Sequence, residues 1–215
     1  SNMNVGTVVS NGRTVYNTPI KTQLCPSETS SVGLNGYPQG STKNGSAHLW
    51  VIGNYAGNYY VLGNPNHRGT ATTDIYQREQ GLSRPASLLD GTSNVIALTE
   101  RYGTCGNTGN PDAGSTYGNL WCDSNSVWRP VFCIASSSKA APDLPATGAY
   151  PPCEKFQVTP HWNRSCLSTR AQSSHSGGIN ACLADGSVRF VQFGIDDVVW
   201  ANACDPQDGN VLKDF

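Results

Sequence analysis

Three features of the sequence predict a β-rich α+β fold with an antiparallel sheet, long loops and few short helices. Asp185-Gly186 lies between two apolar runs, and this dipeptide favours the positive backbone angles of a tight hairpin turn. Residues 94–100 are rich in apolar and β-branched side chains and predict a buried strand. Charged residues make up only 13% of the 215, and 23 are glycine, as expected of a loop-rich β protein.

The predicted hairpin over 179–193 implies a pairing of its two strands. Counting outward from a two-residue turn pairs Leu183 with Val188 and Ala181 with Phe190. Paired residues share a face of the sheet. We therefore expect one face fit for a core, formed by Ile179, Ala181, Leu183, Val188 and Phe190, and a mixed face with Asn180, Cys182 and Arg189.

The remaining chain predicts a single domain over 1–215. Residues 48–62 suggest a strand, a turn and a second extended piece, and 83–89 suggest a short helix capped by Ser83. A strand is expected near 128–134. Acidic residues at the start of 196–203 favour a short helix there. The stretch 103–174 has little periodicity and predicts a loop-rich insertion pinned by disulfides.

The eight cysteines predict disulfides in an oxidising compartment. Their number is even, and none forms a Cys-x-x-Cys pair that would suggest a zinc ribbon or a thioredoxin-like motif. Spacing alone leaves the connectivity open, although Cys105 with Cys122 and Cys153 with Cys166 would each close a local loop. The cysteines expected in disulfides are Cys25, Cys105, Cys122, Cys133, Cys153, Cys166, Cys182 and Cys204.

Charge and motif content argue against several classes of function. With a net charge of −1, the chain lacks the excess of basic residues that is typical of proteins that bind nucleic acid or a membrane surface. The sequence has no run approaching the ~20 apolar residues of a membrane span. It also has no Gly-x-Ser-x-Gly elbow and no phosphate-binding glycine loop. We therefore expect no enzymatic activity.

Polar residues at two turns are candidates for a Ca²⁺ site. The run Asp90-Gly91-Thr92-Ser93-Asn94 is rich in the oxygen ligands that hard cations prefer. The alternative is an Asx-turn, in which the side chains bond the local backbone. The candidate metal ligands are Asp90, Asn94 and Asp185.

His175 and the aromatic residues leave further alternatives open. His175 is a candidate metal ligand or general base with Asp185, or a residue that orders a turn by bonding backbone. Aromatic side chains in Gly/Asn-rich contexts suggest stacking on sugars, or packing beneath loops. They are Trp50, Tyr55, Tyr59, Tyr60, Trp121, Trp128 and Trp162.

Several motifs, taken together, resemble one family of bacterial proteins. His175, nine residues and then Asp185-Gly186 resemble the H-X9-DG region of the prepilin-like DUF1559 family, which is expanded in planctomycetes. Four further stretches resemble motifs of that family in the same order. They are Leu24-Cys25-Pro26-Ser27, Asn54-Tyr55-Ala56-Gly57, Asp90-Gly91-Thr92-Ser93-Asn94 running on to Thr99-Glu100-Arg101, and the ending 208–215.

The resemblance implies a pilin-like globular head. The resemblance also implies that the native protein has a prepilin leader and a long apolar N-terminal helix, which have no counterpart in this sequence. That helix would anchor the protein in the membrane and assemble it with other pilin or pseudopilin subunits of a type IV pilus or type II secretion-like system. The location would be extracytoplasmic, at the cell surface or in the periplasm.

Two other functions remain as alternatives. One is a secreted carbohydrate- or surface-binding module that uses loop aromatics and Ca²⁺ to hold a glycan. The other is an extracytoplasmic metallohydrolase built around His175, Asp185, Asp90 and Glu100.

Overall fold

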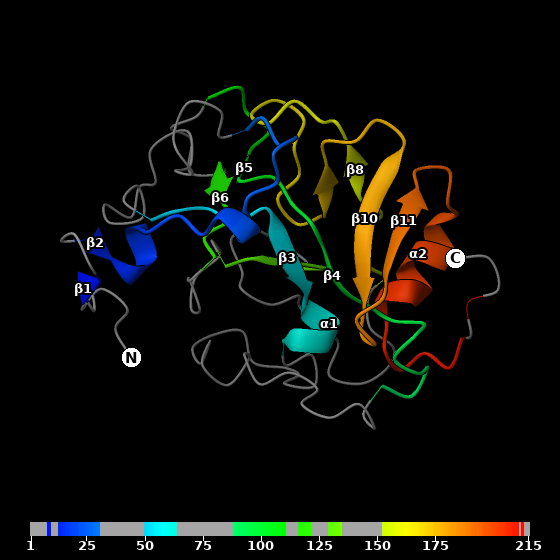
Figure 1. The fold of residues 1–215 in the computed structure, drawn as a ribbon. Helices are drawn as coiled ribbons and strands as arrows, with labels where there is room; N and C mark the ends of the chain where they lie inside the picture. The colour runs from blue at the N-terminus through cyan, green and yellow to red at the C-terminus, as the bar shows by residue number, and fades with distance from the viewer. Residues whose placement is uncertain are drawn as a thin grey trace, which may run out of the picture.

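A five-stranded sheet forms the centre of the fold (Figure 1). The structure is a computed structural model that describes residues 8–9, 13–30, 50–63, 88–110, 116–121, 129–134, 152–210 and 212. The strand order is β11-β10-β4-β3-β7, and neighbouring strands are antiparallel except for the parallel pair β3–β7. Their bounds are β3 Tyr55–Asn58, β4 Ile96–Glu100, β7 Val131–Phe132, β10 Gly178–Leu183 and β11 Val188–Gln192.

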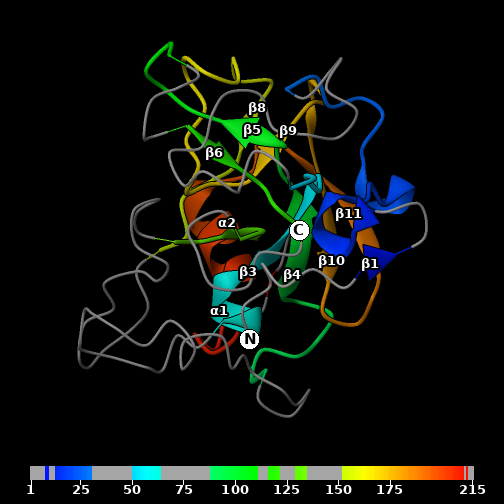
Figure 2. The same ribbon diagram turned by 90° about the vertical axis from the view of Figure 1, so that its left-hand side faces the viewer.

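Short ladders and helices complete the described part of the chain. The strand pairs are β1 (Val8–Val9) with β2 (Arg13–Thr14), β5 (Thr104–Cys105) with β6 (Tyr117–Gly118), and β8 (Gln157–Val158) with β9 (Gln172–Ser173). The helices are the 3₁₀ turns η2 (Val15–Asn17) and η3 (Lys21–Gln23), and α1 (Tyr59–Leu62) and α2 (Asp197–Cys204). The ladders β5–β6 and β8–β9 lie at the end of the molecule opposite α1 (Figures 1 and 2).

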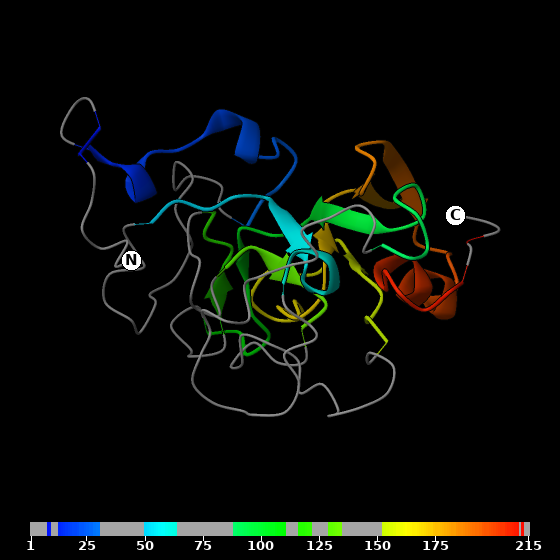
Figure 3. The same cartoon turned by 90° about the horizontal axis from the view of Figure 1, so that it is seen from below.

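Helix α2 packs its apolar side against one face of the sheet. The helix expected over 196–203 is confirmed, and Asp196 caps it, since its carboxylate accepts from the backbone N of Val198 at 2.8 Å. Trp200 is fully buried and contacts the ring of Phe156 edge-on, with 4.8 Å between centroids. Figure 3 shows α2 on one side of the sheet and the blue segment 13–30 towards the other. None of the helices among the described residues has the length and apolar character needed to cross a membrane.

The predicted hairpin is present, but the predicted pairing is wrong by one residue. Leu183 N donates to Ser187 O at 2.8 Å and Gly186 N donates to Leu183 O at 3.0 Å, so the loop contains three residues, 184–186. Gly186 has φ 87°, as expected where a left-handed residue closes a three-residue hairpin loop. Ile179 therefore pairs with Val191, and Asn180 pairs with Phe190.

This shift of one residue moves two predicted core side chains to the other face, because side chains alternate along a strand. Val188 is 68% exposed and Phe190 is 51% exposed, whereas Val191 is buried. Across the sheet, Tyr55 and Leu98 are also exposed, at 38% and 40%. We call the surface formed by Tyr55, Leu98, Val188 and Phe190 the outer face.

The predicted strand over 94–100 is confirmed as β4, whereas the expectation for 48–62 needs correction. The predicted turn around 53–57 is strand β3, and the expected second extended piece is the helical turn α1. Asn58 starts that turn, because its side chain accepts from Tyr60 N at 2.9 Å. The expected strand near 128–134 is reduced to β7. The predicted helix over 83–89 lies almost wholly outside the described residues.

The expectation that all eight cysteines form disulfides is wrong for three of the described ones. The disulfides are Cys105–Cys166 and Cys133–Cys153, so neither suggested local pair exists. Cys25, Cys182 and Cys204 are free, and Cys122 lies outside the described residues.

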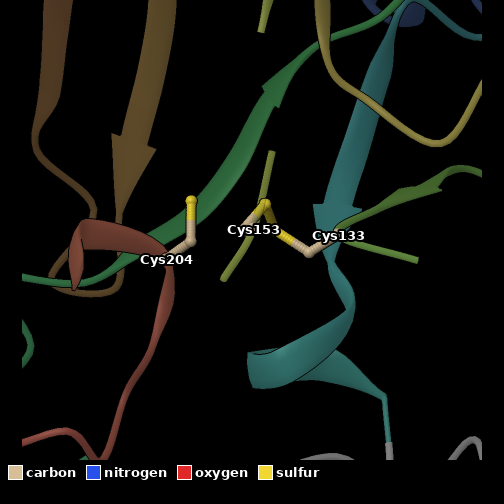
Figure 4. Close-up of side chains that lie close together, drawn as sticks. All are labelled: Cys133, Cys153 and Cys204. Atoms are coloured by element: carbon tan, nitrogen blue, oxygen red, sulfur yellow. A yellow bond between two sulfur atoms is a disulfide. The ribbon is translucent and has the colours of Figure 1, made fainter. Parts of the chain in front are cut away.

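The free cysteines lie in different surroundings. Cys182 has Leu98 and Val188 as its cross-strand neighbours. Cys204 lies beside a bridge whose sulfurs are already joined (Figure 4). Burial, with the nearby Asp205 charge, raises the pKa of the Cys204 thiol well above its ordinary value, which keeps it protonated and unreactive. The surroundings of Cys25 are described below.

The hairpin loop predicts a specific sensitivity at Gly186. A Cβ there meets nothing within 4 Å, so any cost of Gly186→Ala comes from its positive φ alone. We expect this variant to lose about 1–2 kcal/mol of unfolding free energy in urea denaturation. Gly194→Ala is the matched control, because that position is equally open and has no positive φ. A loss of the same size in both variants would contradict the loop assignment.

Candidate functional site

Three chemically reactive side chains from distant segments meet at one end of β4. A thiol sulfur of Cys25, a carboxylate oxygen of Glu100 and an imidazole nitrogen of His175 all lie within 4.8 Å of one another. We call these residues the Cys25–Glu100–His175 cluster. The last part of segment 13–30 and the start of β10 lie at the same end of the molecule in Figure 1. Each member belongs to a different motif of the family resemblance.

Glu100 is the most constrained member of the cluster. It is the last residue of β4, pairs with Tyr55 across the sheet, and is buried. One carboxylate oxygen, Oε2, accepts from Ser173 Oγ at 2.9 Å and from Asn180 N at 3.2 Å. The other, Oε1, accepts from Asn180 Nδ2 at 2.8 Å and lies 3.0 Å from His175 Nε2. These contacts fix the carboxylate in one orientation.

His175 lies in the connection between β9 and β10. Its backbone N donates to Ser173 Oγ at 3.0 Å, so the serine that bonds Glu100 also positions His175. The imidazole remains accessible, since its side chain is 34% exposed. The imidazole itself contacts Glu100, a pairing that only the metallohydrolase alternative had suggested, and the serine side chain is the group that bonds backbone in this turn.

Cys25 follows η3 and is held at its backbone. Its N donates to Asn54 Oδ1 at 2.8 Å, and Asn54 Nδ2 donates to Glu28 Oε2 at 3.0 Å. Glu28 in turn accepts from Ser30 N, and Ser30 Oγ accepts from Thr104 N. This buried chain of hydrogen bonds fastens the loop 25–30 to the start of β3 and to β5.

The cluster has an electrostatic effect on its neighbour Tyr55. Partial burial raises the pKa of the Tyr55 hydroxyl, and the negative charges of Cys25 and Glu100 raise it further. The phenol therefore stays neutral at physiological pH. It offers an uncharged hydroxyl beside the cluster.

Arg101, next to Glu100 in sequence, anchors the opposite side of the strand end. Its guanidinium donates to Asn119 Oδ1 at 3.2 Å, Arg129 O at 3.1 Å and Ser168 O at 2.6 Å. Complete burial lowers its pKa to about 10. The Glu-Arg dipeptide of the motif thus joins separate segments through buried hydrogen bonds.

The predicted Ca²⁺ ligands all make hydrogen bonds within the protein: Asn94 and Asp185 bond nearby residues, whereas Asp90 bonds the distant segment 208–209. Asp90 accepts from Asp208 N at 3.1 Å and Gly209 N at 2.8 Å, while Asn94 Nδ2 donates to Asp90 O. Asp185 accepts from the N and Oγ of Ser187. The contacts of Asn94 and Asp185 are local, as the alternative interpretation expects, whereas Asp90 ties the turn to a segment near the C-terminus. Calcium binding by these residues stays a prediction.

The residues suggested for a metallohydrolase are only partly brought together. His175 and Glu100 are in contact, whereas Asp185 lies at the far end of β10 from His175. Asp185 N instead donates to Thr92 O at 3.0 Å, so the hairpin loop contacts the turn that follows Asp90. The member that sequence reasoning missed is Cys25, which was assigned to a disulfide.

The outer face contains an apolar groove beside β3. Its volume is about 530 Å³, and it includes Tyr55 and Leu98 of the outer face. We call it the outer groove. Of the aromatics suggested for sugar binding, Trp50, Tyr59 and Tyr60 are buried, and Trp128 lies outside the described residues. The groove is lined by Gln23, Tyr55, Gly57, Tyr59, Leu62, Gly63, Leu98, Trp121, Arg129, Pro130 and Val131.

The contacts of Arg101 predict a large loss of stability on a conservative change. Arg101→Lys replaces a planar donor fork with one ammonium, which cannot reach all three acceptors. We expect a loss of about 3 kcal/mol in unfolding free energy, measured by urea denaturation. Arg170→Lys is the control, because its ion pair with Glu154 is partly exposed and is worth at most about 1 kcal/mol. Equal effects of the two changes would contradict the anchoring role of Arg101.

Two carboxylates predict opposite dependences of stability on pH. Burial, with the Asp208 and Asp90 charges, raises the pKa of Asp205, so its ionisation above that pKa costs the folded state stability. Hydrogen bonds from Ser187 lower the pKa of Asp185 in the folded chain. The ionised carboxylate therefore stabilises the fold at pH values above the pKa that Asp185 has in the unfolded chain. This stabilisation is lost as the pH falls through the pKa of the folded state.

Thermal melting at pH 7 and at about pH 3 checks these signs, because both carboxylates are largely protonated in the unfolded chain at the lower pH. Asp205→Asn should raise the Tm at pH 7 relative to the unmodified chain, and Asp185→Asn should lower it. Both differences should shrink at the lower pH. A higher Tm for Asp185→Asn at pH 7 would contradict the assignment.

Comparison with known proteins places the chain in one family. Residues 2–197 match the family described as "Protein of unknown function (DUF1559)". No curated protein and no solved structure matches the chain. The family match covers most of the sequence and includes all three members of the Cys25–Glu100–His175 cluster. The protein therefore belongs to the DUF1559 family.

Proposed function

We propose that this chain is the globular head of a prepilin-like or pseudopilin-like structural subunit, displayed at the cell surface or in the periplasm. In this proposal a long N-terminal helix of the native protein anchors the subunit in the membrane and assembles it with other subunits. The head carries no catalytic function. The observation that carries the proposal is the apolar outer face of the sheet with its groove.

The outer face differs from a solvated sheet surface. The apolar side chains Leu98 of β4 and Val188 and Phe190 of β11 are exposed there, on the two strands that flank β10, while the opposite face packs on α2. Contiguous exposed apolar surface marks an interaction site. A helix laid on the face of an antiparallel sheet is the usual way to cover it. The outer groove beside β3 offers a position for the apolar side of such a helix.

The use of the motif residues supports a structural role. Glu100 and Arg101 each bond several segments, and Asn54 links Cys25 to Glu28. These contacts hold loops around the sheet. The disulfides Cys105–Cys166 and Cys133–Cys153 also support an extracytoplasmic location, since disulfides persist in oxidising compartments.

The proposal predicts the N-terminal peptide of the native protein. We expect a processed, N-methylated aromatic residue followed by about 20 apolar residues, seen by mass spectrometry of protein from cell membranes and from the shed extracellular fraction. An ordinary signal-peptidase cut with no apolar helix after it would contradict the filament assignment.

The position of the helix is tested in the same native protein by photo-crosslinking. A photoreactive residue at Leu98, on the outer face, should form an adduct with the N-terminal helix. The matched control is Val198, which is 65% exposed on α2 at the opposite side of the sheet, and it should form none. Adducts from position 198 alone would contradict the proposed docking surface.

A glycan-binding module is the second candidate, and the outer groove favours it as well. Tyr55 and Trp121 line the groove together with the polar residues Gln23 and Arg129, a combination suited to stacking and hydrogen bonding with a sugar. Saturable binding on a glycan array that is lost in Trp121→Ala would favour this function. A native protein without an N-terminal helix would strengthen it further.

A further inference from the structure

We propose that the Cys25–Glu100–His175 cluster is a binding site for a divalent transition-metal ion of the zinc type. The ligands would be Cys25 Sγ, Glu100 Oε1 and His175 Nε2, with the fourth position open to solvent. This inference does not depend on the filament proposal, because it rests on different residues. It also differs from the expected calcium site at Asp90, Asn94 and Asp185.

The spacing of the three candidate ligand atoms fits one ion. They lie within 4.8 Å of one another, and Nε2 of His175 is 3.0 Å from Oε1 of Glu100. Around a tetrahedral zinc ion with bonds of about 2.0–2.3 Å, ligand atoms are separated by roughly 3.3–3.6 Å. The imidazole–carboxylate pair therefore needs to open by only a few tenths of an ångström, and the sulfur already lies within 4.8 Å of both atoms.

The ligand types select the class of metal. Thiolate, imidazole and carboxylate together suit zinc and similar borderline ions, whereas calcium and magnesium prefer oxygen ligands alone. Three protein ligands with one open position is the arrangement of accessible, rather than purely structural, zinc sites. A thiolate and a carboxylate with a neutral imidazole carry two negative charges, which balance the charge of a divalent ion.

The groups around the cluster hold the ligands in place before any metal binds. Asn180 Nδ2 donates to Glu100 Oε1, and Ser173 Oγ bonds both Glu100 and the backbone of His175. Asn54 holds the backbone of Cys25. Partners of this kind orient metal ligands and raise affinity. The site is thus preorganised by three polar side chains, Ser173 of β9, Asn180 of β10 and Asn54 directly before β3.

The cluster is accessible to an ion, unlike the other sulfur-rich group of the described residues. His175 is 34% exposed at its side chain and Cys25 is half-buried, so an ion can enter from solvent. In the group Cys133, Cys153 and Cys204 all residues are buried, and two of the sulfurs are bonded to each other. That group cannot offer three thiolates while its disulfide is intact.

Cobalt(II) titration tests the site directly. The chain is freed of metal with a chelator under conditions that keep its disulfides intact, and Co²⁺ is added under anaerobic conditions. We expect one ion per chain, with visible ligand-field absorption of a four-coordinate ion and near-ultraviolet charge transfer from the Cys25 thiolate. Zn²⁺ should displace Co²⁺ and bleach both absorptions.

Variants separate the metal site from a structural role of the same residues. Cys25→Ser should abolish the charge-transfer absorption, and Cys182→Ser, at a second half-buried free cysteine, should retain it. Asn180→Ala leaves the three ligands in place and should weaken Co²⁺ binding by about 10–100-fold. His175→Gln should weaken Co²⁺ binding although the metal-free variant has the circular dichroism spectrum and the Tm of the unmodified chain.

Two results would overturn the proposal. One is a folded, metal-free chain that shows no charge-transfer absorption at millimolar Co²⁺. The other is an absorption retained in Cys25→Ser but lost in Cys182→Ser, which would place the thiolate elsewhere.

Discussion

The carboxylate of Glu100 is the contact on which the arrangement of this end of the molecule depends. It is buried at the end of β4 and is bonded by Ser173 and by the main chain and side chain of Asn180, with His175 beside it. A buried carboxylate is costly unless its hydrogen bonds are satisfied, so every segment that supplies a donor is held in place. Arg101 imposes the same constraint through its buried guanidinium. Together the two residues position loops that have little regular structure of their own.

The two faces of the sheet have different roles. One face is closed by α2, Trp200 and Phe156, and it forms the main core. The other carries the exposed apolar side chains of the outer face, and it buries the polar side chain of Glu100 at the Cys25–Glu100–His175 cluster. The solvent-facing side of an antiparallel sheet is normally polar, so an exposed apolar face indicates an interaction surface. This asymmetry underlies the proposed docking of a helix, and the polar end of the same face underlies the proposed metal site.

Element type was predicted more reliably than pairing. The strand β4, the hairpin and the helix α2 follow from local signals, namely a run of apolar and β-branched residues, an Asp-Gly turn and acidic residues at the helix start. The expectations that failed concern strand register and the type of a short element, which depend on contacts with neighbouring residues. A loop of three residues in place of two exposes Val188 and Phe190, and the cap by Asn58 turns an expected strand into α1. Local propensity does not distinguish these outcomes, because Asp-Gly is compatible with both loop lengths.

The sequence by itself determined the β-rich class, the central hairpin, the family and the presence of disulfides. Each depends on residues close together in the chain, on short motifs in a fixed order, or on composition. Only the tertiary structure decided which cysteines pair, which side of the hairpin faces the core, and that Cys25, Glu100 and His175 meet. Glu100 and His175 are 75 residues apart along the chain, and Cys25 is farther still from His175. Contacts of that range depend on how the strands are ordered in the sheet, and no local pattern in the sequence encodes that order.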